Sequence, residues 1–153
     1  MADMLDREAY SYREAKDVPT FDDGGQIAVM DGGCAPCSWG ARMIARLDSA
    51  GQFRICPVQS PLGEALVRHY GLAPGDPETW LFLENGQAWG GMEAIIRIAE
   101  RLGAAGRLAT AMRILPRRLR EWLYRRIARN RHRLGRSDMC AIADERLRRR
   151  LLT

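Results

Sequence analysis

A strand pattern changes directly into a helix pattern at a pair of cysteines, and this junction limits the possible folds more than any other feature. Residues Gln26–Met30 form a short apolar run with β-branched members, which is typical of a buried strand. The run ends at Asp31-Gly32-Gly33, where two glycines allow a tight path out of the strand. Pro36 then falls in the first turn of a helix, where proline is tolerated, and Gly51 ends that helix.

Similar patterns continue along the chain. They predict a second buried strand at Phe53–Val58, a helix at Leu62–Tyr70, hairpin strands at Trp80–Leu83 and Gln87–Trp89 around Asn85-Gly86, and a helix at Met92–Leu102. The Asn-Gly pair is the strongest short signal for a hairpin. Three further helices are predicted at Arg107–Leu115, Arg117–Arg133 and Asp144–Leu152.

The order of these elements is that of a thioredoxin-like core. Its first two strands would pair in parallel through a right-handed crossover, and the hairpin would add antiparallel strands. We therefore expect an α/β fold with a thioredoxin-like (βαβαββα) core at residues 26–103. Residues 1–25 are predicted to be a poorly ordered leader, with one short helical turn near Arg7–Ala15. Residues 104–153 are predicted to form an arginine-rich helical extension packed on the core.

Charge is divided unevenly along the 153 residues, which carry a net charge of +5. Residues 106–153 contain 15 arginines and four acidic residues, whereas residues 1–105 contain nine basic and 15 acidic residues. A basic tail is typical of proteins that bind acidic partners such as nucleic acid, anionic lipid or an acidic protein. It is also typical of a helix whose charged face lies in solvent. No apolar run approaches the ~20 residues that cross a bilayer, and the first residues do not form a secretory signal. We therefore expect a cytoplasmic protein without a spanning segment.

The spacing of Cys34 and Cys37 is that of a redox pair. If Cys34 is the N-cap of the helix, its sulfur faces unpaired N–H groups and the positive end of the helix dipole, which stabilise a thiolate. Cys37 lies one turn further along, at a separation that suits a disulfide. We expect Cys34, exposed at the helix tip, to attack, and the more covered Cys37 to resolve the mixed disulfide. Pro36 would stiffen the turn between them, because it lacks an N–H group.

Three further side chains are candidates near this pair. Asp31 would oppose thiolate formation if it pointed inward, or would accept a proton from Cys37 through water, and the sequence does not decide between these roles. Trp39 would shield the site or contact substrate, or would be an ordinary structural aromatic. Cys140 would fold back as a third redox thiol or be a bystander.

Two other classes of function stay open. In the first, the close cysteine pair is half of a zinc site completed by His132 and Cys140, although the usual spacing of zinc ligands is absent. In the second, the chain is a binding module whose basic C-terminal helices contact nucleic acid or an anionic membrane surface, and the cysteines are not catalytic.

The residues around the cysteines resemble a known family. The run Asp31-Gly-Gly-Cys-Ala-Pro-Cys37 is similar to the signature of the DCC family of thiol–disulfide oxidoreductases, which are small bacterial-type proteins similar to thioredoxins. The similarity continues in the stretches Val58–Gly63, Glu93–Gly103, Leu115–Arg120, Ile127–Arg131 and Ser137–Cys140. The resemblance implies a thioredoxin-like fold and thiol–disulfide exchange by Cys34 and Cys37.

The expected reaction needs no metal or organic cofactor. Its substrate would be a disulfide-containing protein or a low-molecular-weight thiol, and a thioredoxin- or glutathione-type donor would supply the electrons. One departure concerns the third strand, where thioredoxins place a cis-proline directly before a threonine that faces the sulfurs. Here the order is Pro77-Glu78-Thr79, with proline one residue too early. Either the loop differs, or Thr79 faces the site without that proline.

Overall fold

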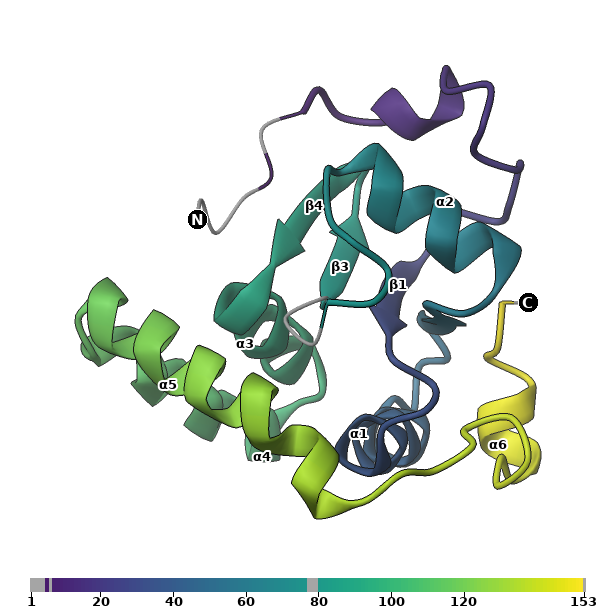
Figure 1. Cartoon of the computed structure of the whole chain (residues 1–153). Helices are drawn as coiled ribbons and strands as arrows, with labels where there is room; N and C mark the ends of the chain where they lie inside the picture. Colours follow the sequence, from purple (N-terminus) through teal and green to yellow (C-terminus); the bar gives the residue numbers. More distant parts are fainter. Residues whose placement is uncertain (1–4, 6, 77–79, 153) are drawn as a thin grey trace.

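Four strands form one mixed sheet at the centre of the molecule (Figure 1). The computed structural model describes residues 5, 7–76 and 80–152. The strands lie in the order β2-β1-β3-β4, with bounds β1 Gln26–Met30, β2 Phe53–Pro57, β3 Leu81–Glu84 and β4 Gln87–Gly90. Strand β1 pairs in parallel with β2 and antiparallel with β3, and β3 pairs antiparallel with β4. The predicted mixed α/β fold is confirmed, and this topology is consistent with a thioredoxin-like fold.

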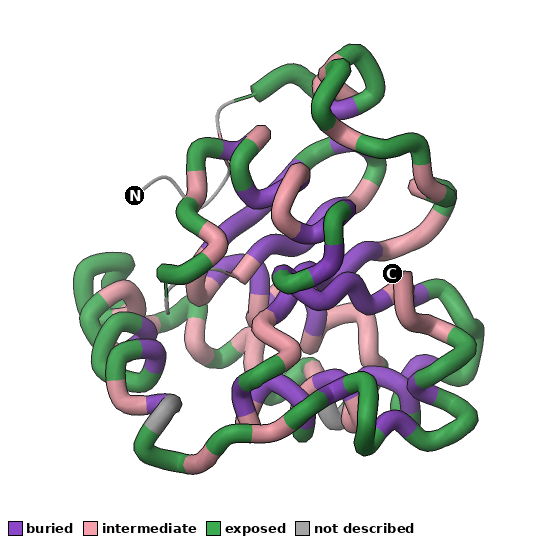
Figure 2. The backbone as a smooth tube through the Cα atoms, turned by 45° about the vertical axis from the view of Figure 1, so that its right-hand side comes forward, coloured by how far each residue is buried: buried purple, intermediate pink, exposed green. Residues whose placement is uncertain are grey.

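Helices cover both faces of the sheet, because successive side chains of a strand point to opposite faces. Ala28 and Met30 of β1 pack in the cluster formed with α1 (Ala35–Leu47) and α3 (Gly91–Arg101). Ile27 and Val29 pack in the cluster formed with α2 (Pro61–His69). All four residues are buried, so β1 is inside the core on both faces, as its continuous apolar run predicted. Figure 2 shows that the buried backbone runs through the middle of the molecule.

The hairpin between β3 and β4 turns at Asn85 and Gly86, as predicted. Both residues have positive φ angles, 50° and 75°, which are the values that a tight type I′ turn requires. A Cβ atom on Gly86 would lie 2.5 Å from ring atoms of Tyr10. Glycine is therefore needed here both for the backbone conformation and for space.

The chain after α3 forms helices and 3-10 segments that pack on the core (Figure 1). They are α4 (Ala104–Arg107), the 3-10 segment η2 (Leu108–Ile114), α5 (Arg117–Asn130), the 3-10 segment η3 (Arg131–Leu134) and α6 (Glu145–Arg148). Helix α5 contacts α3, whereas η3 and α6 contact α1. None of the helices in the described part of the chain is long and apolar enough to cross a membrane.

The last predicted helix, Asp144–Leu152, is shorter than expected. Helix α6 ends at Arg148 because the following residues join the edge of the sheet. The N–H of Ile55 donates to the carbonyl of Arg150 at 2.8 Å, and the N–H of Leu152 donates to the carbonyl of Ile55 at 2.8 Å. These bonds satisfy backbone groups of β2 that an open sheet edge would leave unpaired.

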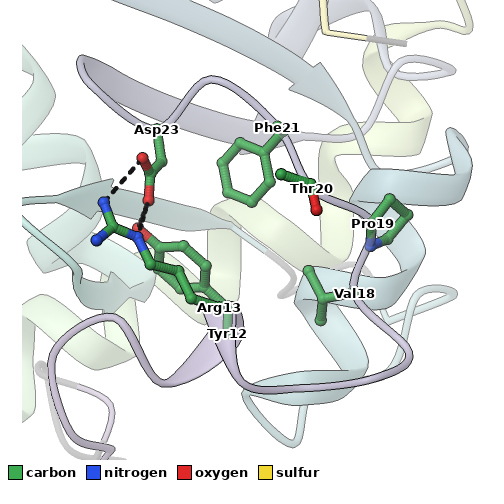
Figure 3. A pocket seen from close by; sticks show the side chains of 7 residues that line it. All are labelled: Tyr12, Arg13, Val18, Pro19, Thr20, Phe21 and Asp23. Carbon is green, nitrogen blue, oxygen red and sulfur yellow. Dashed lines mark hydrogen bonds and ion pairs between the residues drawn. The ribbon is translucent and has the colours of Figure 1, made fainter.

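The segment before β1 packs on the core, which differs from the poorly ordered leader predicted for residues 1–25. In its described part, Tyr12 of the 3-10 turn η1 (Ser11–Arg13) is buried in the same cluster as α2. The Tyr12 hydroxyl and the Arg13 guanidinium both donate to the carboxylate of Asp23, each at 2.8 Å (Figure 3). The aromatic residues of this segment show neither helix nor strand periodicity in the sequence, because they contact the core from an irregular backbone.

Candidate redox site

The two cysteines lie at the start of α1, where the chain leaves β1. Cys34 is the N-cap residue, with extended φ and ψ angles of −104° and 124°. Its carbonyl accepts the first helical hydrogen bond, from the N–H of Ser38 at 2.9 Å. Cys37 lies in the first turn, and both cysteines are unpaired thiols in this structure. The predicted placement of the pair across a strand–helix junction is confirmed.

Both sulfurs are buried, which corrects the expectation that Cys34 is exposed at the helix tip. Cys34 is 0 % exposed and Cys37 is 2 % exposed. The cover is residues Gly135–Met139, here called the covering segment, which runs antiparallel to the loop before α1. The N–H of Ser137 donates to Gly33 at 3.1 Å, and the N–H of Met139 donates to Gly32 at 2.9 Å. The tip of α1 is thus closed by a part of the chain about a hundred residues away in sequence.

An ion pair between buried Arg131 and half-buried Asp31 reaches the sulfur of Cys37. The guanidinium of Arg131 donates one N–H from Nη1 to Cys37 Sγ at 3.4 Å and another from Nη2 to Asp31 Oδ2 at 3.1 Å. Asp31 Oδ1 accepts hydrogen bonds from the N–H of Gly33 at 2.8 Å and from Gln59 Nε2 at 2.7 Å. Arg131 is only 5 % exposed, so this pair lies in a region from which water is largely excluded. Asp31 therefore pairs with a cation that touches the redox sulfur, a role outside the two that sequence left open.

Burial dominates the acidity of Cys37. Burial, and after it the hydrogen bond and charge of the neighbouring Cys34 thiol, raise the pKa of Cys37 to about 12. The charge of Arg131 and a hydrogen bond from Trp80 act in the opposite direction and lower the pKa. Cys37 is therefore protonated at neutral pH, and Arg131 is the cation that favours its thiolate once the proton leaves.

Cys37 and Arg131 also line a groove of about 160 Å³. Its other walls are apolar side chains from α1, α3 and α5, together with Trp80. Cys37 thus lies beside an apolar surface formed jointly by the core and the C-terminal helices.

Comparison with known proteins identifies the family. The family model described as DCC1-like thiol-disulfide oxidoreductase matches residues 28–137, a range that includes both cysteines, Asp31 and Arg131. This chain belongs to the DCC1-like family.

Two curated proteins are similar to this chain. An uncharacterized protein, YuxK of Bacillus subtilis, is 26% identical over 128 residues, covering 83% of this chain and 93% of the relative. A chloroplastic DCC family protein of Arabidopsis thaliana, At1g52590, is 29% identical over 123 residues, covering 79% of this chain and 72% of the relative. No solved structure matches the chain.

The other predicted site residues of this DCC1-like chain are more scattered. Trp39 is exposed and is not among the residues that line the groove, although Pro36 is. Cys140 is also exposed, and it lines a separate cavity of about 350 Å³ with Gly32 and Gly33. It therefore lies beside the loop before α1, without a contact to Cys34 or Cys37 among the described interactions. Thr79 lies outside the described residues.

Arg131 is the residue that sequence reasoning missed. It occurs in the stretch Ile127–Arg131 that resembles the DCC family, but it is one of 15 arginines in the last 48 residues. An acidic residue three positions before Cys34 gives a partial signal, because a carboxylate beside a buried site needs a cation. That signal does not indicate which arginine supplies it.

The alternative zinc site has no support in the part of the chain that the structure describes. Within it, no group of three or more His, Cys, Asp or Glu side chains is arranged to hold a metal ion. Several C-terminal arginines are also engaged with acids. Arg113 and Arg120 contact Glu93 at 2.8 and 3.6 Å, and Arg117 contacts Glu121 at 3.2 Å. Part of the basic charge of the extension is thus balanced inside the molecule.

Proposed function

We propose that this protein catalyses thiol–disulfide exchange through Cys34 and Cys37. The observation that carries the proposal is the contact between the guanidinium of Arg131 and the sulfur of Cys37, at 3.4 Å, next to a second cysteine at the N-terminus of α1. A buried cation beside one of two adjacent thiols favours thiolate chemistry over a purely structural pair. Membership of the DCC1-like family supports the same reaction.

The reaction has two steps. In the first, the thiolate of Cys34 attacks a sulfur of the substrate disulfide, which forms a mixed disulfide and releases one substrate thiolate. In the second, Cys37 loses its proton and attacks the Cys34 sulfur, which releases the second substrate thiol and leaves a Cys34–Cys37 disulfide. Two electrons pass from the protein dithiol to the substrate, and an external thiol donor of the thioredoxin or glutathione type restores the dithiol.

The two cysteines divide these roles according to their surroundings. Cys34 is the N-cap of α1, at the positive end of the helix dipole. Burial raises the pKa of Cys37 to about 12, which keeps it protonated until the second step. Arg131 then stabilises the thiolate of Cys37, and Asp31 holds Arg131 in position. The chemistry needs no metal or organic cofactor, and a reducing compartment such as the cytoplasm suits it.

The test is turnover of a disulfide with dithiothreitol as donor, compared among three variants. Cys34→Ser is expected to abolish the rate above the uncatalysed reaction, because the attacking sulfur is gone. Cys37→Ser is expected to trap a mixed disulfide on Cys34, detectable by intact mass. Cys56→Ala is the control, because this buried thiol packs in the cluster on the α2 side of the sheet. Equal turnover by the wild type and Cys34→Ser would contradict the proposal.

A further inference from the structure

A cavity at the opposite end of α1 from the redox cysteines is lined mainly by arginines. It has a volume of about 550 Å³, which is within the range that small-molecule ligands occupy. Three segments that are distant in sequence meet around it: the last turn of α1, the start of β2, and the chain from α6 onward. Together they supply the arginines of this arginine cavity, which are Arg46, Arg54, Arg146, Arg149 and Arg150.

The one acidic residue that lines the cavity, Asp48, is already engaged. It is 7 % exposed, and its carboxylate accepts hydrogen bonds from the backbone N–H of Gln52 at 3.2 Å and of Phe53 at 2.9 Å. The same carboxylate accepts a hydrogen bond from Nη1 of Arg150. Asp48 therefore balances Arg150 and leaves the other arginines of the cavity without a carboxylate from its walls.

Three arginines of the cavity have donors available for a ligand. Arg46, Arg54 and Arg146 make no ion pair with an acidic residue in the part of the chain that the structure describes. Nη1 of Arg54 donates to the backbone carbonyls of Gly51 at 3.1 Å and of Phe53 at 3.3 Å. These bonds hold the guanidinium of Arg54 at the cavity and leave the donors on its Nε and Nη2 for another acceptor.

Positive charge therefore accumulates around the cavity. Arg149 contacts Glu145 at 2.9 Å, but both side chains are exposed, and a surface ion pair of this kind contributes little stabilisation. Like charges held around one space repel one another, and an anion bound between them removes that cost. Phosphate is a suitable anion, because the planar guanidinium group can donate two parallel hydrogen bonds to its oxygens.

The remaining walls indicate which kind of phosphate compound fits. Apart from the arginines and Asp48 they consist of Ala45, Ser49 and Gly51, so none of the lining side chains can stack on a nucleobase. A single phosphate group would contact only one part of this cavity, whereas several linked phosphates would reach arginines of all three segments. We propose that the arginine cavity binds a small polyphosphate anion, which it recognises through the phosphate groups alone.

The experiment titrates the full chain with inorganic triphosphate by isothermal titration calorimetry, without divalent cations. A salt concentration of about 0.15 M screens weak attraction between exposed charges. Saturable binding of one triphosphate per chain is expected. ATP should bind with similar affinity, because the walls do not recognise adenine. Inorganic phosphate should bind at least about tenfold more weakly, since it loses charge-assisted hydrogen bonds to several arginines.

Matched variants place the binding in the cavity. Arg146→Gln removes a charge from an exposed lining residue of α6, and the dissociation constant for triphosphate is expected to rise about tenfold. Arg54→Gln is expected to have a similar effect. Arg118→Gln is the control, because it removes the same charge from an exposed residue of α5 that does not line the cavity. Its dissociation constant should match that of the wild type, and urea unfolding without ligand checks that each variant is folded.

Three results would overturn the proposal. Absence of saturable triphosphate binding would mean that the arginines of the cavity are only solvated charges. Equal weakening by Arg146→Gln and Arg118→Gln would mean that the anion is attracted by the overall charge of the C-terminal extension. Much tighter binding of ATP than of triphosphate would mean that the site recognises a nucleoside.

Discussion

At the scale of single residues, the site depends on charge that is buried and paired. The charge of buried Arg131 would be costly alone, and the half-buried carboxylate of Asp31 satisfies it. The same guanidinium contacts the sulfur of Cys37. The ion pair that satisfies the charge of Arg131 therefore also places a cation beside the redox sulfur. Gln59 and the backbone of Gly33 fix the carboxylate that orients Arg131.

Removing the cation tests its effect on Cys37. In Arg131→Met, the pKa of the Cys37 thiol is expected to rise, because its charge-stabilising neighbour is lost. The second step should then slow severalfold at neutral pH, and its pH dependence should move to higher pH. Quenched-flow measurement of mixed-disulfide decay against pH gives this profile.

Arg133→Met is the matched control, since it removes the same charge from an exposed position two residues away. Its pH profile should coincide with that of the wild type. If Arg131→Met folds cooperatively and keeps the wild-type profile, Arg131 has no part in the acidity of Cys37.

At the scale of elements, the covering segment keeps solvent away from Cys34. Its backbone pairs with Gly32 and Gly33, and the side chain of Met139 is fully buried in the cluster that contains Cys34. The segment contributes no regular strand or helix of its own, so its position depends on these few bonds and on Met139. Such short irregular segments open more easily than core helices do.

Weakening the covering segment should expose Cys34. Met139→Ala leaves a cavity beneath the segment and is expected to cost about 2–5 kcal/mol, so that the segment opens more often. Alkylation of Cys34 by iodoacetamide, followed by peptide mass analysis, should be faster than in the wild type.

A second truncation separates local opening from general loss of stability. Leu147→Ala removes an equally buried side chain of α6 from the same cluster, away from the covering segment. Under conditions that give the two variants the same free energy of unfolding, iodoacetamide should alkylate Cys34 faster in Met139→Ala than in Leu147→Ala. Equal rates in the two variants would mean that Cys34 is reached by global unfolding.

At the scale of the whole molecule, segments from both chain ends complete the core. Tyr12 closes the α2 side of the sheet, and Leu147 contributes to the opposite cluster, with the residues after α6 bonded to β2. We propose that residues 104–153 act as an extension of the 26–103 core, because the redox site includes Arg131 and the covering segment. Burial on both faces also places a third thiol, Cys56, entirely out of solvent.

This burial predicts a loss of stability in alkaline solution. Burial raises the pKa of Cys56 to about 11, above the value of about 8.5 for an exposed thiol. A folded-state pKa above the unfolded one means that the stabilising contribution is complete below about pH 8.5 and is lost as the pH rises toward 11. The expected loss from this thiol is about 3 kcal/mol, measured by urea unfolding between pH 8 and 11.

Cys56→Ala isolates the contribution, because alanine cannot ionise. Its free energy of unfolding should fall less steeply over that pH range than that of the wild type, while other groups such as Tyr70, whose pKa burial also raises, act equally in both. Parallel curves for the two proteins would show that Cys56 does not titrate with unfolding.

The sequence by itself determined the elements that depend on neighbouring residues. The apolar run of β1, the Asn85-Gly86 turn and the placement of Cys34 and Cys37 at the start of α1 follow from local spacing and backbone preference, which act over a few residues. The resemblance around Asp31–Cys37 likewise identified the DCC family correctly.

Only the tertiary structure decided what surrounds the sulfurs. Arg131 lies 94 positions from Cys37 and 100 from Asp31, and nothing local distinguishes it from the other arginines of the tail. The burial of Cys34 likewise depends on backbone bonds to residues 135–139, which have no strand pattern of their own. The position of a buried charge is set by which distant groups can satisfy it together, and that condition is met only once the chain has closed around the site.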